Sequence, residues 1–234
     1  MMTTQSANRV VAILAVVVAA LLLPAAAGAF TGQLWSTSSG ILGTGSWITP
    51  GPAWIEWNVT QNPDDSWLYS YDFHHPESAT SHFILEVSES FTVDDIIRMQ
   101  GNYSGYELKE HLSGPGNPNM PGSIYGIKFD NAWGVDSHFE LTTMRTPVWG
   151  DFYAKGGATP SRFLKTAPRR PVHCTAWNAG FDLADPVVPA ADGSMEFHLL
   201  VPDTNEPPPV PEPSTMLLMS SGLLGMAYVW RRRK

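Results

Sequence analysis

The sequence predicts a mainly β protein: an antiparallel β-sandwich with one short helix, flanked by an N-terminal signal peptide and a C-terminal hydrophobic anchor helix. Three observations support this prediction. Short segments with alternating apolar and polar residues fill the middle of the chain. Gly and Pro, 20 of each in the chain, stand between many of these segments, as is typical of turns between strands. Two apolar stretches without this alternation lie near the two ends.

Residues 1–29 have the three-part layout of a secretory signal peptide. One positive charge precedes residues 10–23, which form an unbroken run of fourteen apolar residues. This run is shorter than the ~20 residues that an ordinary membrane-spanning helix needs. The small residues Ala27 and Ala29 then predict cleavage by signal peptidase before Phe30. An uncleaved anchor or a buried helix is the alternative.

The middle of the chain, residues 30–201, is predicted to form the β-sandwich domain. Residues 67–73 illustrate the pattern, because they put four aromatic side chains on one face of a strand. Enrichment in β-branched and aromatic residues predicts further strands at 54–60, 82–87, 124–129, 138–144, 148–155, 172–177 and 195–201.

Two other features lie between these strands. Thr92 and Asp95 match a capping-box pattern, which predicts one short helix that continues through Ile96 to Met99. Residues 101–122 are rich in Gly, Pro and Asn and predict a long surface loop. Such a loop either carries function or is a tolerated insertion.

The C-terminal region has distinct parts. Residues 202–210 form a Pro-rich linker, and residues 211–234 combine a tripeptide, an apolar stretch from Met216 to Trp230 and a basic end. The tripeptide is Pro211, Glu212 and Pro213, and the basic, stop-transfer cluster is Arg231, Arg232, Arg233 and Lys234. The apolar stretch covers only about 22 Å as a helix, less than the ~30 Å hydrocarbon core of a bilayer. We therefore expect temporary retention in the inner membrane, with the basic end on the cytoplasmic side.

This tail, from Val210 to Lys234, resembles the PEP-CTERM sorting signal of exported proteins in Gram-negative bacteria. The resemblance implies recognition by exosortase, a membrane-embedded processing enzyme that is thought to cut near the tripeptide. It also implies a final location at the cell surface or outside the cell, in bacteria that make extracellular polysaccharide. Residues 81–83, 126–130 and 149–157 in turn resemble the bodies of PEP-CTERM proteins of unassigned function. A plain membrane anchor is the alternative for the tail.

The charge distribution excludes nucleic acid as a partner. Acidic residues outnumber Lys and Arg by 22 to 14, and five of the basic residues lie in the two ends. The body of the chain thus lacks the clustered cations that neutralise phosphates.

We expect no enzyme activity, because no set of residues indicates catalysis. Cys174 is the single cysteine, so it can form no internal disulfide, and it lies in a predicted strand without a catalytic signature. Glu86, Glu140 and Glu196 alternate with apolar residues and are expected to face solvent rather than to pair across a cleft. A hydrolase with an unrecognised site is the least favoured alternative.

No cofactor and no transition-metal site are predicted. His74 and His75 would point to opposite faces of a strand, and His82, His138 and His198 could converge only through the fold. Calcium is the better candidate, at two groups of turn residues with oxygen ligands. These groups are Asn62, Asp64 and Asp65, and Asp130 with Asn131.

The sequence therefore predicts an exported, non-enzymatic protein of the cell surface or extracellular matrix. The alternative is a carbohydrate-binding module of the exopolysaccharide matrix. In that case Trp54, Trp57 and Trp67, three of nine tryptophans, would stack on sugar rings.

Overall fold

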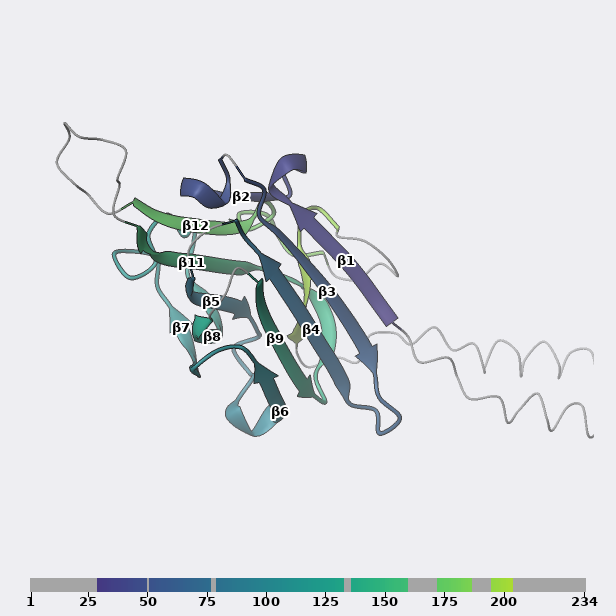
Figure 1. Ribbon diagram of the computed structural model, residues 1–234. Coiled ribbons are helices and arrows are strands. Elements are labelled where there is room, and N and C mark those ends of the chain that lie inside the picture. Colours follow the sequence, from purple (N-terminus) through teal and green to yellow (C-terminus); the bar gives the residue numbers. More distant parts are fainter. Residues whose placement is uncertain are drawn as a thin grey trace, which may run out of the picture. The chain divides into compact units, whose positions relative to one another are not determined.

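The computed structural model describes residues 29–49, 51–76, 79–132, 136–159, 172–186 and 195–203, which form an antiparallel β-sandwich (Figure 1). A five-stranded sheet, in the order β1-β3-β4-β9-β6, packs against a six-stranded sheet, in the order β2-β12-β11-β5-β8-β7. Strands β10 and β13 form a separate two-stranded sheet. All pairings among the described strands are antiparallel, so the predicted mainly β, antiparallel architecture of the middle of the chain is confirmed.

The strands of the five-stranded sheet are β1 (Ala29–Trp35), β3 (Trp54–Gln61), β4 (Trp67–His74), β6 (Ile96–Gly101) and β9 (Asp136–Thr143). Those of the six-stranded sheet are β2 (Ile41–Thr44), β5 (Thr80–Glu86), β7 (Gly105–His111), β8 (Ile124–Ala132), β11 (Phe152–Thr159) and β12 (Val172–Asn178). The two-stranded sheet consists of β10 (Thr146–Gly150) and β13 (Leu199–Asp203). The helical elements of the described residues are the single 3-10 turns η1 (Ser36–Ser38), η2 (Gly45–Trp47) and η3 (Val93–Asp95).

Side-chain alternation decides which face of each strand is buried. In β4 the four aromatic residues that were predicted to share a face are all buried, and the residues between them are half-buried on the opposite face. Strand β3 has the same pattern and pairs with β4 along its full length. The sequence pattern therefore fixes which side of this hairpin meets the second sheet.

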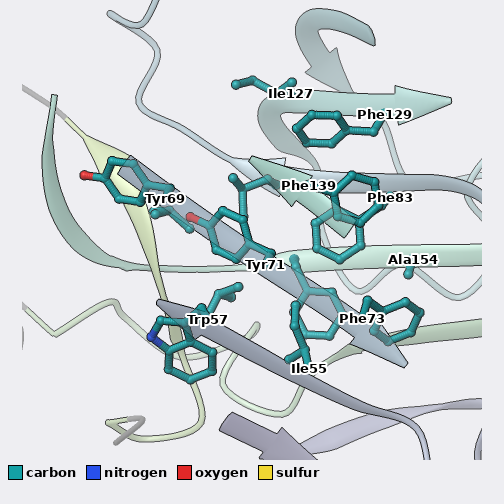
Figure 2. Close-up of a cluster of buried hydrophobic side chains, with 14 of the residues drawn as sticks. Ile55, Trp57, Tyr69, Tyr71, Phe73, Phe83, Ile127, Phe129, Phe139 and Ala154 are labelled. Atoms are coloured by element: carbon teal, nitrogen blue, oxygen red, sulfur yellow. The ribbon is translucent and has the colours of Figure 1, made fainter. Parts of the chain in front are cut away.

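Aromatic rings fill the space between the two sheets (Figure 2). Phe83 of β5 stacks on Phe139 of β9, with ring centroids 4.6 Å apart. Phe73 of β4 and Phe152 of β11 make a second contact between the sheets, at 6.0 Å. Each fully buried ring contributes about 1.5–3 kcal/mol of transfer free energy. This core explains how the sheets stay together in a chain with a single cysteine.

The predicted helix at Thr92–Met99 is only one turn long. Thr92 and Asp95 form the expected capping box around η3, in which the Thr92 backbone N–H donates to Asp95 Oδ2 at 2.7 Å. The chain is extended from Ile96 onward and continues as β6, which pairs with β9. The β-branched Ile96 and Ile97 favour this strand, and pairing with β9 outweighs the local helix signal.

Two predicted strands have different limits. The predicted strand 148–155 is divided at Asp151 into β10 and β11, and the two halves pair in different sheets. The predicted strand 195–201 begins only at Leu199, because Glu196 and Phe197 have positive φ angles of 49° and 63° and form a turn. It also extends to Asp203, into the predicted linker.

The predicted loop 101–122 is partly strand, because β7 lies within it. The remaining loop covers the outer face of the six-stranded sheet, where Met120 packs with Ile84, Ile124 and Tyr153 in a second small core. Tyr153 Oη donates to the Pro118 carbonyl at 2.8 Å. The loop therefore closes a hydrophobic core.

Within the described segments, no helix has the length and apolar character needed to cross a bilayer. The predicted signal peptide up to residue 28, the linker from residue 204 and the predicted anchor helix lie outside the described residues.

Candidate functional site

Most of the predicted processing residues lie outside the described part of the chain. They are Ala27, Pro211, Glu212, Pro213, Arg231, Arg232, Arg233 and Lys234. Ala29 and Phe30 are described and begin β1, where Phe30 pairs with Val59 and its ring lies 6.1 Å from that of Trp67. A chain that begins at Phe30 would lose only the Ala29–Thr60 pair from β1.

Trp57 and Trp67, two of the three tryptophans predicted to bind sugar, are core residues. Their exposed fractions are 3% and 7%, and Figure 2 shows Trp57 among the side chains between the sheets. Gly32 on β1 lies under the Trp57 ring, and a Cβ at Gly32 would overlap it. The sugar-stacking prediction is wrong for Trp57 and Trp67, because a buried ring offers no face to a ligand.

Trp54 is half-buried, and both faces of its ring are covered. It lies in a row of paired residues across three strands, between Trp35 on β1 and His74 on β4. The Trp35 ring stacks on it at 4.8 Å, and the His74 ring stacks on it at 4.4 Å. Trp54 therefore offers an edge rather than a face to solvent, an arrangement that does not favour stacking of a sugar on its ring.

The residues considered for calcium already have structural contacts: Asn62, Asp64 and Asp65 surround a turn, and Asp130 and Asn131 lie within β8. Asp64 Oδ1 accepts hydrogen bonds from the Ser66 backbone N–H at 3.2 Å and from the Ser66 hydroxyl at 2.6 Å, which lowers the pKa of Asp64. Asp130 Oδ1 lies 2.9 Å from Lys128 Nζ. Asn131 and Asp65 have positive φ angles of 50° and 66°. The carboxylate oxygens of Asp64 and Asp130 already accept hydrogen bonds or form an ion pair, and Asp65 and Asn131 support local bends of the backbone.

The structure does not bring His82, His138 and His198 together. His138 lies on the outer face of the five-stranded sheet, with Nδ1 2.7 Å from Asp72 Oδ1. His82 is buried on the outer face of the six-stranded sheet beside Tyr153, at a ring distance of 6.0 Å. His198 is fully buried immediately before β13.

Cys174 is buried, and its Sγ lies 3.4 Å from the Ser46 hydroxyl oxygen. The three glutamates do not share a site. Glu86 is half-buried on β5 and accepts the Asp151 backbone N–H at 2.7 Å, whereas Glu140 lies on β9 of the other sheet. Glu196 is exposed in the turn before β13.

The outer face of the five-stranded sheet is polar and hollowed. A groove of about 620 Å³ crosses β1, β3 and β4. Its polar side chains are those of Thr31, Gln33, Glu56, Asn58, Ser70 and Asp72. A second groove of about 370 Å³ lies over β4, β6 and β9, with Arg98, Gln100 and Glu140 in its lining. Carboxylates, amides and hydroxyls on a wide open face suit a polyhydroxylated ligand.

Apart from these grooves, one cluster of ionisable side chains combines residues that are far apart in the sequence. Asp151 follows β10, Asp185 lies in the segment after β12, and His198 immediately precedes β13. One ligand-capable atom of each lies within 4.8 Å of the others. Asn178 Nδ2 donates to Asp151 Oδ1 at 2.6 Å. Sequence reasoning missed this cluster, because no local spacing motif connects the three residues.

Comparison with known proteins adds a finding for the tail. Residues 209–234 match the family model of the PEP-CTERM protein-sorting motif. The chain carries a PEP-CTERM sorting signal. The comparisons with curated proteins and with solved structures give no match.

The match confirms the prediction, made from the sequence, that the tail resembles a PEP-CTERM sorting signal. Its range includes Pro211, Glu212 and Pro213 and the basic cluster Arg231, Arg232, Arg233 and Lys234. The motif implies export and sorting toward the cell surface, with exosortase as the processing partner. It covers none of the β-sandwich, whose grooves and side-chain cluster are separate from the sorting signal.

Proposed function

We propose that this chain is an exported, non-enzymatic protein of the cell surface or extracellular matrix of a Gram-negative bacterium. The PEP-CTERM motif at residues 209–234 carries this proposal. Signal peptidase would remove the leader before Phe30. The tail would then hold the folded domain transiently at the inner membrane until an exosortase-type enzyme cuts near Pro211–Pro213.

The physical character of the tail supports this order of events. Pro211 and Pro213 fix φ and bias the residues before them away from helix, so the tripeptide suits a protease cleft that takes extended chain. The apolar stretch of fifteen residues makes a marginal anchor. The four cations after it are costly to translocate and would stop export there.

The end of the sandwich supports cleavage without damage to the fold. β13 ends at Asp203, and seven residues separate it from Pro211. Such a segment spans at most about 25 Å when fully extended. A cut near the tripeptide would therefore release the sandwich with every described strand from β1 to β13.

Replacement of the tripeptide tests the proposal. In a host that contains exosortase, Pro211-Glu212-Pro213→Ala-Ala-Ala should trap a full-length precursor in the inner membrane, whereas the wild-type chain loses its tail. The measurement is a fractionation blot with an antibody against the β-sandwich. Pro207-Pro208→Ala-Ala removes two prolines upstream of the matched motif and should be processed like wild type. Equal release of the tripeptide variant and of wild type would contradict a role of residues 211–213 in sorting.

Carbohydrate binding is the second candidate function, and the polar groove over β1, β3 and β4 favours it. A polysaccharide would lie on the groove through hydrogen bonds to side chains such as those of Glu56 and Asn58, without stacking on Trp54, Trp57 or Trp67.

Co-sedimentation with the extracellular polysaccharide of the host tests this second candidate. Loss of one hydrogen bond costs about 0.5–1.5 kcal/mol, so Asn58→Ala should weaken binding by about 2- to 12-fold. Glu110→Ala, at an exposed position on β7 of the other sheet, is the control and should bind like wild type. Binding that is unaffected by Asn58→Ala would remove the groove as the site.

A further inference from the structure

The cluster of Asp151, Asp185 and His198 joins three separate parts of the sandwich. Asp151 lies at the break between β10 and β11, and Asp185 lies beyond the end of β12. His198 precedes β13, which pairs with β10. A bond among these residues would therefore connect the two-stranded sheet to the six-stranded sheet.

His198 directs a free lone pair into the cluster. Its side chain has an exposed fraction of 0%. Nδ1 lies 3.1 Å from the Met195 carbonyl oxygen, which only accepts hydrogen bonds, so Nδ1 carries the proton. Nε2 is then unprotonated in the neutral ring, and it is buried without a hydrogen-bond partner. A buried unpaired acceptor is costly, which points to a group that is meant to occupy that position.

The two carboxylates face this nitrogen. Nε2 lies 3.3 Å from Asp185 Oδ1 and 3.9 Å from Asp151 Oδ1. Two ligands at ~2.0–2.1 Å from a tetrahedral ion are about 3.3–3.4 Å apart. The first distance already matches this separation, and the second needs a contraction of about 0.5 Å. Asp185 is half exposed, so solvent can supply a fourth ligand.

The local charge favours a cation. Two carboxylates, those of Asp151 and Asp185, lie beside the unprotonated Nε2 of the neutral His198 imidazole. The Asn178 amide holds the Asp151 carboxylate in place, and the Met195 carbonyl holds the imidazole. Such supporting hydrogen bonds orient the ligands in metal sites.

We propose that Asp151, Asp185 and His198 bind a divalent transition-metal ion of the zinc class. One imidazole nitrogen and two carboxylate oxygens are ligands that Zn²⁺ accepts, whereas Ca²⁺ prefers a larger set of oxygens alone. The ion clamps β13, the last described strand before the sorting tail, to the β10–β11 corner and to the segment after β12. Gly180 leaves room for this arrangement, because a Cβ there would lie 2.6 Å from His198 Cε1.

Zinc binding and thermal stability of the purified exported protein test the proposal. After treatment with EDTA, Zn²⁺ should bind with a stoichiometry of one per chain. Free Zn²⁺ at 100 times Kd should raise Tm by about 5–10 °C. Ca²⁺ and Mg²⁺ should give less than half of that shift. A shift with Ca²⁺ equal to that with Zn²⁺ would overturn the assignment to the zinc class.

The variant Asp185→Asn identifies the site, because the residue is half exposed and the substitution keeps the side-chain volume. It should weaken Zn²⁺ binding at least tenfold. Asp182→Asn, in the same exposed segment but outside the ligand set, should bind Zn²⁺ like wild type. No Zn²⁺ binding by wild type, or equal binding by wild type and Asp185→Asn, would contradict the proposal.

Discussion

His82 shows how a single buried residue in this fold depends on pH. The side chain is 6% exposed, and its Nε2 has no hydrogen-bond partner. Burial, with the positive charges of Lys128 and Lys155, lowers the pKa of His82 to about 4, although Asn117 and Asp130 oppose this shift. The neutral imidazole is therefore the form that the folded state accommodates.

The folded protein should lose stability as His82 becomes protonated in the unfolded state. This loss begins as pH falls below 6.5, the ordinary value, and is complete near pH 4. It amounts to at most about 3–4 kcal/mol, by the relation between pKa and free energy. Urea unfolding of wild type and His82→Gln between pH 7 and pH 4 checks this expectation. The difference between the two free energies of unfolding should shrink or reverse across this range, and parallel pH profiles would contradict it.

Some secondary-structure elements of this fold are determined by local sequence signals, and others by the strands with which they pair. The capping box of Thr92 and Asp95 was readable from the sequence, but the strand that follows was not, because β9 lies some forty residues further on. Strands β1 and β7 were not predicted, because Gly and polar residues interrupt their apolar pattern. The break at Asp151 was not predicted either, because only the fold places β10 and β11 in different sheets.

Asp95 also links η3 to the connection between β9 and β10. Arg145 Nε donates to Asp95 Oδ1 at 2.9 Å, and Nη2 donates to Oδ2 at 3.0 Å. The hydrogen bonds from Arg145, together with those from Thr92, lower the pKa of Asp95 to about 2. The carboxylate form therefore stabilises the fold above pH 3.8, and this contribution disappears as pH falls through 2.

The variant Asp95→Asn should lower the free energy of unfolding by about 1–2 kcal/mol at pH 7, because it weakens a bidentate ion pair that is partly screened by solvent. Chemical denaturation at pH 7 measures the loss, which should fade as pH approaches 2. Asp94→Asn, at the neighbouring exposed carboxylate, is the control and should change stability by less than ~0.5 kcal/mol. Equal stability of the two variants would show that the Arg145 contact contributes nothing.

At the scale of the whole molecule, the chain combines a sorting signal with a separate β-sandwich. The sorting signal could be predicted because its chemistry is local: Pro211, Glu212 and Pro213, an apolar stretch and four cations in order. The fold class could be predicted because alternation is local as well. The exposure of Trp54, Trp57 and Trp67 could not, because it depends on which strands cover each ring. The cluster at His198 could not either, since the fold alone brings its members together.

The measurement that tests sorting and processing most directly is the intact mass of the wild-type protein recovered from the cell surface or the medium of an exosortase-containing host. The predicted mass corresponds to a chain that begins at Phe30 and ends near the tripeptide, before Met216. Such a species keeps every described residue of the sandwich except Ala29. A surface form that still contains Arg231–Lys234 would contradict the account.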